Sequence, residues 1–111
     1  MGFYTRVGRN VNIQIHVTNI STSGLTLSND LFVQGLPFPS SSTSTRQATG
    51  TMRVDRVNVE STCFGVVPIL GSGRSTVQIY QNRDNTTDIS VQVGDILSGQ
   101  GDMFISINYV T

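Results

Sequence analysis

The sequence contains no lysine and no tryptophan, and its 111 residues include one alanine, one glutamate and one cysteine, Cys63. Alanine, glutamate and lysine are among the best helix formers, so their scarcity excludes a mainly helical protein. A single cysteine permits no internal disulfide. The apolar runs fall short of the ~20 residues that a membrane-spanning helix needs. The N-terminus leads straight into polar sequence, so we expect no signal peptide.

The seven positive charges are all arginines, and they balance seven acidic residues to give a formal net charge of zero. A nucleic-acid-binding protein needs a basic surface that displaces counterions from phosphates. The composition therefore argues against nucleic acid as a partner. Near-zero net charge also lowers the barrier to self-association, which is compatible with an oligomer.

The residues that are present favour strands. Valine and isoleucine together number 22, and β-branched side chains fit a sheet. Apolar and polar residues alternate with a period of two, which predicts strands with one buried face, over residues 11–18, 75–81 and 103–110. We also predict a short strand over residues 4–7 that forms a hairpin with the first of these, a strand over 25–33, and a strand covered on both faces over 62–70.

The spacing of these segments predicts one all-β domain over residues 1–111. Eight or nine short strands recur about every ten residues, separated by Gly, Pro and Asn turns, and no significant helix is expected. Such a pattern is typical of an antiparallel sandwich or barrel. The Ser/Thr-rich stretch from Ser40 to Gly50 is predicted to be an exposed loop.

Two short patterns resemble functional motifs, but each is better explained by a structural role. Gly71–Thr76 resembles a phosphate-binding loop, but it has no lysine and precedes a strand, so a hairpin turn is the better interpretation. His16 and Cys63 are the only histidine and cysteine. Since His16 lies on a polar strand face and Cys63 in an apolar run, we expect neither nucleophilic catalysis nor a zinc site from them.

The turn after residue 81 carries oxygen ligands at alternate positions, namely Asn82, Asp84, Thr86 and Asp88. Calcium binds six to eight such oxygens, but the central glycine and distal glutamate of an EF-hand are missing. A polar hairpin turn is therefore favoured over a calcium site. No close pair of carboxylates suggests glycosidase chemistry either. We predict no catalytic residue, no metal ligand and no cofactor.

A sugar-binding role for the same region is the alternative that stays open. Sugars need directional donors and acceptors together with an aromatic face. The outward-facing Tyr80 and its polar neighbours could supply both, and the candidate ligand-binding residues are Arg74, Tyr80, Asn82, Arg83 and Asn85. The competing interpretation is that these are ordinary polar turn residues.

Three segments together resemble the C-terminal domains of bacteriophage tail fibres and tailspikes. They are Gly2-Phe3-Tyr4-Thr5-Arg6-Val7-Gly8-Arg9-Asn10-Val11 at the start, Gly35-Leu36-Pro37-Phe38-Pro39 midway, and Ile105-Ser106-Ile107-Asn108-Tyr109 at the end. The order and spacing of these motifs span essentially the whole chain. After Pro39 that family carries more aromatic residues, where this sequence has Ser and Thr.

The resemblance implies a β-sandwich of jelly-roll type that forms a homotrimer at the fibre tip. It implies a C-terminal module of a longer virion protein at the phage tail tip, made in the host cytoplasm, without catalytic activity. Its function would be to bind host-surface polysaccharide or lipopolysaccharide, or else to serve as a structural trimerisation cap with no ligand. Apolar residues poorly placed for a single core are the candidate trimer interface, namely Phe3, Tyr4 and Phe104.

Overall fold

A computed structural model describes residues 2–42 and 47–111 of the chain. It confirms the all-β prediction. The eight strands are β1 (Gly2–Val7), β2 (Asn10–Ile20), β3 (Phe32–Val33), β4 (Ala48–Asp55), β5 (Cys63–Leu70), β6 (Val77–Arg83), β7 (Ile89–Ser90) and β8 (Gly101–Val110). One short 3-10 turn, η1 (Val93–Asp95), is the helical part of these residues. No helix in the described ranges is long and apolar enough to cross a membrane.

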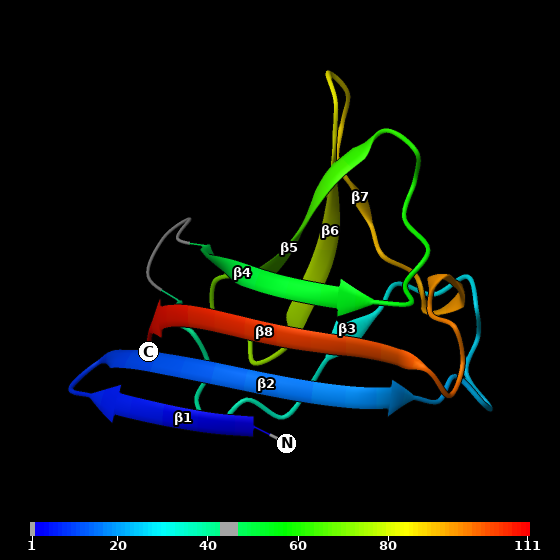
Figure 1. Ribbon diagram of the computed structural model, residues 1–111. Helices are drawn as coiled ribbons and strands as arrows, with labels where there is room; N and C mark the ends of the chain where they lie inside the picture. Colours follow the sequence, from blue (N-terminus) through cyan, green and yellow to red (C-terminus); the bar gives the residue numbers. More distant parts are fainter. Residues whose placement is uncertain (1, 43–46) are drawn as a thin grey trace.

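The strands form one antiparallel sheet that curls into a half-barrel (Figure 1). Its order is β1-β2-β8-β4-β5-β6-β3, with β7 also beside β6. The sheet bends at β4, because Gly50–Asp55 pairs with β8 whereas Ala48 and Thr49 pair with β5. β4 and β5 then diverge, so the two halves of the sheet enclose the core in a sandwich-like arrangement.

The core lies on the inner face of this curled sheet. Along β2 and β8, every second side chain points inward, as the alternation predicts. On the other half, Val77 and Ile79 of β6 are fully buried while Gln78 and Tyr80 point outward, which confirms that prediction. The buried apolar cluster consists of Val11, Ile13, Leu70, Val77, Ile79, Val91, Ile96, Met103, Ile105, Ile107 and Tyr109.

Two predicted strands differ from the structure. Residues 21–30 form turns, and Leu25 and Leu27 are exposed, so the predicted strand over 25–33 shrinks to β3. β5 is not covered on both faces, because Phe64 is 75% exposed. An apolar run shows only that the side chains are hydrophobic. Whether both faces of the strand are buried depends on which other elements pack against them. Within the predicted loop after Ser40, residues 43–46 lie outside the described residues, and β4 already begins at Ala48.

Tyr109 of β8 ties the segment before Ser40 to the sheet. Its side chain is 4% exposed, and its hydroxyl donates a hydrogen bond to the carbonyl oxygen of Phe38 at 2.7 Å. Burial raises the pKa of this phenol above its usual value. The neutral form is therefore favoured in the folded state.

We expect Tyr109→Phe to lower the free energy of unfolding by about 1 kcal/mol at pH 8, because the Phe38 carbonyl loses its donor. With a raised folded pKa, the stability that the phenol contributes is complete below about pH 10 and is lost as the pH rises through the folded pKa. The difference in free energy of unfolding between wild type and variant, measured by urea unfolding, should therefore become smaller between pH 8 and pH 11. A gap that stays constant over this range would contradict the assignment.

Candidate functional site

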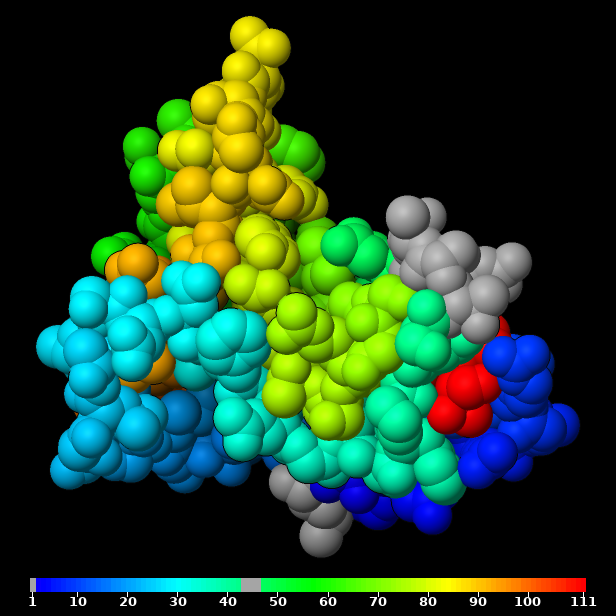
Figure 2. All heavy atoms as spheres, turned by 180° about the vertical axis from the view of Figure 1, so that it is seen from behind, coloured from blue at the N-terminus to red at the C-terminus, as the bar shows by residue number. Residues whose placement is uncertain are grey.

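A groove on the outer face of β5, β6 and β3 brings together the best candidates for binding. It has a volume of about 400 Å³, and Figure 2 shows this side of the molecule, where the segment leading into β6 (yellow-green) lies near β3 (cyan). We call it the Arg74–Tyr80 groove. Its lining combines two aromatic rings with charged and polar side chains, namely Phe32, Gln47, Ile69, Gly71, Arg74, Thr76, Gln78, Tyr80 and Asp88.

Strand register places these side chains side by side. Gln78 is paired with Phe32 of β3 on one side and with Ile69 of β5 on the other. Tyr80 follows two residues later on the same face of β6 and is paired with Ser90 of β7. Because Val77 and Ile79 are fixed in the core, the outward direction of Gln78 and Tyr80 is fixed as well. The floor of the groove is therefore rigid sheet.

Arg74 is held at the rim through its backbone. Its amide donates hydrogen bonds to the Ser40 hydroxyl at 3.1 Å and to the Gly71 carbonyl at 3.3 Å, and its carbonyl accepts one from the Ser40 amide at 2.9 Å. Ser40 is itself buried. In the described part of the chain, neither the guanidinium of Arg74 nor the carboxylate of Asp88 has a hydrogen-bond or ion-pair partner. Both groups are thus available to a ligand.

The five residues proposed from the sequence separate into two places. Arg74 and Tyr80 line the groove, whereas Asn82, Arg83 and Asn85 are not among its lining residues. Arg83 stabilises the β6–β7 hairpin, since it forms an ion pair with Glu60 at 3.1 Å and donates to the Thr87 carbonyl at 2.6 Å. Asn85 has a φ of 53° in the turn at the projecting tip of this hairpin (Figure 1).

Sequence reasoning missed several groove residues for different reasons. Gln78 could have been found, because it shares the outward parity of Tyr80 on one strand. Phe32 carries no such signal, and Asp88 is suggested by the sequence only as a possible calcium ligand. Phe32 lies in a two-residue strand, and it reaches the groove through the pairing of β3 with β6 across more than forty residues of sequence.

The three candidate trimer residues do not form one patch. Tyr4 lies on the inner side of β1, with its ring 5.6 Å from that of Phe38, and the Arg6 guanidinium lies 4.5 Å from the same ring. Phe3 and Phe104 share the opposite side, the outer face of β1-β2-β8-β4. There Phe104 packs edge-on against His16 at 4.8 Å.

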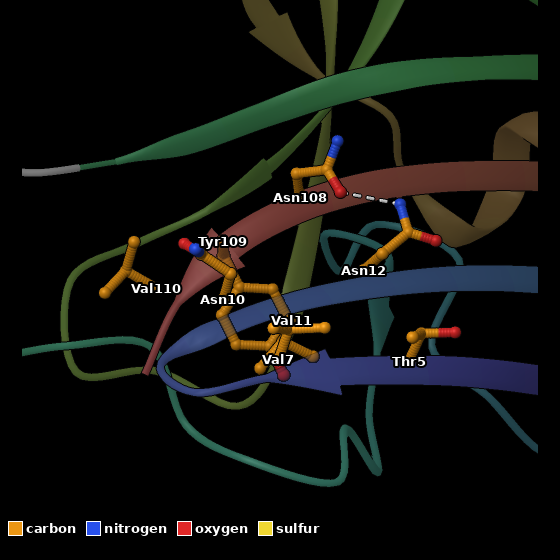
Figure 3. Close-up of a pocket in the computed structure, with 8 residues that line it drawn as sticks. All are labelled: Thr5, Val7, Asn10, Val11, Asn12, Asn108, Tyr109 and Val110. Atoms are coloured by element: carbon orange, nitrogen blue, oxygen red, sulfur yellow. Dashed lines mark hydrogen bonds between the residues drawn. The ribbon is translucent and has the colours of Figure 1, made fainter.

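A second cavity of about 420 Å³ lies on this outer face (Figure 3). Figure 3 shows the Asn12 and Asn108 amides meeting across β2 and β8, where the Asn12 Nδ2 donates to the Asn108 Oδ1 at 2.6 Å. The lining contains no acidic or basic side chain, and much of it is apolar. It offers fewer directional groups to a polar ligand than the Arg74–Tyr80 groove does.

The remaining motifs have structural explanations. Gly71–Gly73 forms the turn between β5 and β6, as predicted, and the chain continues into a strand. Cys63 donates a weak hydrogen bond to the Gly65 carbonyl at 3.2 Å on β5, while His16 lies on β2 in the other half of the sheet. Within residues 2–42 and 47–111, no group of three or more His, Cys, Asp or Glu side chains could hold a metal ion.

Comparison with known proteins adds no relative to this picture. No protein-family model, no curated protein sequence and no solved structure matches the chain.

Proposed function

We propose that the chain is a non-enzymatic, glycan-binding head domain of a bacteriophage tail fibre or tailspike, and that it works as a homotrimer at the tail tip of the virion. The observation that carries the binding role is the Arg74–Tyr80 groove, where two sequence-derived candidates meet Phe32, Gln78 and Asp88. The tail-fibre assignment depends on the three motifs described above, at residues 2–11, 35–39 and 105–109.

The chemistry of the groove suits a sugar. Arginine supplies several N–H donors in a fixed plane, an ionised carboxylate supplies acceptors, and a glutamine amide supplies both. Sugar hydroxyls require this combination. The rings of Tyr80 and Phe32 offer apolar faces to the C–H side of a pyranose. Opposite charges on Arg74 and Asp88 cancel, so the groove favours a neutral, hydroxyl-rich residue of a polysaccharide.

The homotrimer explains how so open a site could be useful. A shallow groove on a single domain binds weakly, because it covers little of its ligand. Three identical grooves on one rigid tip can bind a repetitive polysaccharide together, and the second and third contacts are then intramolecular. We therefore expect weak binding to an isolated repeat unit and much tighter binding to a polymer.

We expect Tyr80→Ala and Arg74→Gln each to weaken polysaccharide binding by at least about ten-fold, since aromatic and arginine side chains dominate binding sites. Binding is measured on an array of bacterial surface polysaccharides. Phe64→Ala is the matched control, because Phe64 is an exposed aromatic residue outside the groove. If Asn85→Ala abolished binding and Tyr80→Ala did not, the site would be the hairpin tip instead.

A structural cap without any ligand is the second candidate function. It is favoured by β1, in which all six residues are exposed although Phe3, Tyr4 and Val7 are apolar. Such a strand is expected to be covered in the assembled protein. A cap would form the same trimer and bind no glycan on the array, and its deletion would abolish fibre assembly rather than adsorption alone. A monomer in sedimentation at micromolar concentration would contradict both functions.

A further inference from the structure

In the β1-β2-β8-β4 half of the sheet, the outermost strands β1 and β4 each have an edge without a partner in the part of the chain that the structure describes. β1 pairs with β2 along one edge, and its other edge is the end of the sheet. β4 pairs with β8 over Gly50–Asp55, but its pairing with β5 ends at Thr49, so the far edge of these six residues is unpaired too. β4 and β5 diverge from that point (Figure 1).

The β1 edge lacks most of the usual protection against pairing with another chain, whereas the β4 edge carries the charged Arg53 and Asp55. Natural edge strands are shielded by proline, lysine, bulges or very short length. β1 has six residues, without proline or lysine, and it pairs with β2 without a register shift. Its one charged side chain, Arg6, is turned aside, since its guanidinium lies over the Phe38 ring and its Nε donates to the Gly8 carbonyl at 2.7 Å.

We propose that the partner of both edges is a second copy of this chain, with β1 of one copy pairing antiparallel along Gly50–Asp55 of β4 in the next. This deepens the proposed homotrimer by naming where its copies meet. The two edges are similar in length, at six residues each, and the register assigned below overlaps five of them. The formal net charge of zero removes overall electrostatic repulsion between copies.

The strand directions favour a closed ring. In the order β1-β2-β8-β4 each strand is antiparallel to the next, so β1 and β4 run in opposite directions. Rotation about an axis parallel to the strands preserves their directions. A rotated copy therefore presents its β1 antiparallel to β4. Contacts of this head-to-tail kind close into rings when the rotation permits it.

The two faces of the sheet restrict the register. Paired residues must lie on the same face, so Phe3, Thr5 and Val7 must meet the outward side chains of β4, which include Thr51 and Arg53. Pairing Thr5 with Thr51 sets Phe3 beside Arg53. On the inner side it sets Tyr4 beside Met52, which is incompletely buried in the single copy. Aromatic–arginine, aromatic–methionine and Thr–Thr neighbours are all favourable.

A shift of the register by two residues toward Thr49 would pair Thr5 with Thr49, which already pairs with Ile69 of β5. A shift by two residues toward Asp55 is also less favourable. It would pair Phe3 with Asp55 and Thr5 with Arg53 on the outer side. The ring would then lie beside a carboxylate rather than a guanidinium, and the negative face of an aromatic ring attracts cations. We therefore assign the Thr5–Thr51 register.

Disulfide trapping tests this contact directly. In the full chain carrying Cys63→Ser, the variants Thr5→Cys and Thr51→Cys are combined. Within one copy these positions lie on strands three spacings apart, about 14 Å, which is too far for a disulfide. We expect mild oxidation to convert most of the double variant into covalent trimers on a non-reducing gel. Asn12→Cys with Thr51→Cys is the control, because Asn12 lies on β2 inside the sheet, and it should give no cross-link.

The possible outcomes distinguish the β1–β4 contact from other ways of forming an oligomer. A trimer by sedimentation that yields no Thr5–Thr51 disulfide would overturn the edge contact and leave the homotrimer standing. Disulfide dimers from Thr5→Cys alone would show that β1 pairs with β1 of another copy. A monomer by sedimentation would overturn both proposals.

Charge substitutions give an independent measurement if the cysteine variants fold poorly. Both side chains are exposed in the single copy. We expect Thr5→Lys combined with Thr51→Lys to shift the protein toward monomers, since like charges directly opposite each other destabilise strand pairing. Thr5→Lys combined with Thr51→Glu should restore the trimer. Equal behaviour of the two pairs would contradict the register.

Discussion

Replacing Gly50 by alanine is expected to destabilise the folded chain by about 3 kcal/mol, at the upper end of the cost of overpacking. Gly50 lies where β4 bends, directly against β8. A Cβ atom there would overlap the Ser106 carbonyl oxygen and come within 2.8 Å of the Ile107 Cγ1. Backbone atoms in a central strand cannot move aside without disturbing the pairing of β8 with β2.

Gly65→Ala is the matched control for this substitution. Gly65 also lies within a strand, but a Cβ atom added there would meet no heavy atom within 4 Å. Its substitution should change stability by no more than about 0.5 kcal/mol. Urea unfolding measures both free energies. Equal effects of the two substitutions would mean that β4 and β8 are less closely packed than described.

Ile79→Ala is expected to lower the free energy of unfolding by about 4 kcal/mol, the typical cost of removing a large buried side chain. Ile79 is completely buried on β6, and the buried cluster to which it belongs contains side chains from both halves of the sheet. The cavity would lie between them, where neither half can collapse freely. Because the same strand carries Tyr80 on its outer side, polysaccharide binding should weaken at temperatures where the variant begins to unfold.

Leu27→Ala provides the comparison, since Leu27 is 57% exposed in a turn region. It should cost no more than about 0.5 kcal/mol. Both variants are compared with wild type by urea unfolding with a common m-value. A small effect of Ile79→Ala would show that the core does not depend on this position.

Strands in which apolar and polar residues strictly alternate could be predicted from the sequence. Which strands pair with each other could not. The patterns around Ile13, Ile79 and Ile105 identify inward and outward side chains, because the period of two is a local property of a strand. That β8 lies between β2 and β4 is set by contacts between residues far apart in sequence. The exposed Phe64 shows that hydrophobic composition alone does not predict burial, since an apolar residue is buried only where another element packs against it.

Some residues of the candidate site could likewise be predicted from the sequence, and others could not. Tyr80 and Arg74 were accessible from the sequence, the first through its outward parity and the second through its place beside a turn. The groove itself could not be predicted, because it also needs Phe32 and Asp88. These two residues are brought beside β6 by its pairing with β3 and β7. Arg83 lies outside the groove and forms an internal ion pair with Glu60, which its sequence position beside the turn does not reveal.

The central place of β8 affects how the protein can be made. β2 has β1 as its neighbour early in translation, but its second neighbour, through pairs such as Val11–Tyr109, is synthesised almost one hundred residues later. Until the ribosome has released Val110, β2 and β4 each lack the strand that joins them. The sheet can therefore be completed only after β8 has been synthesised, and folding is expected to be slow because distant segments have to meet first. Before that pairing the apolar inner faces of β2 and β4 are uncovered, and such partly folded chains are prone to aggregate.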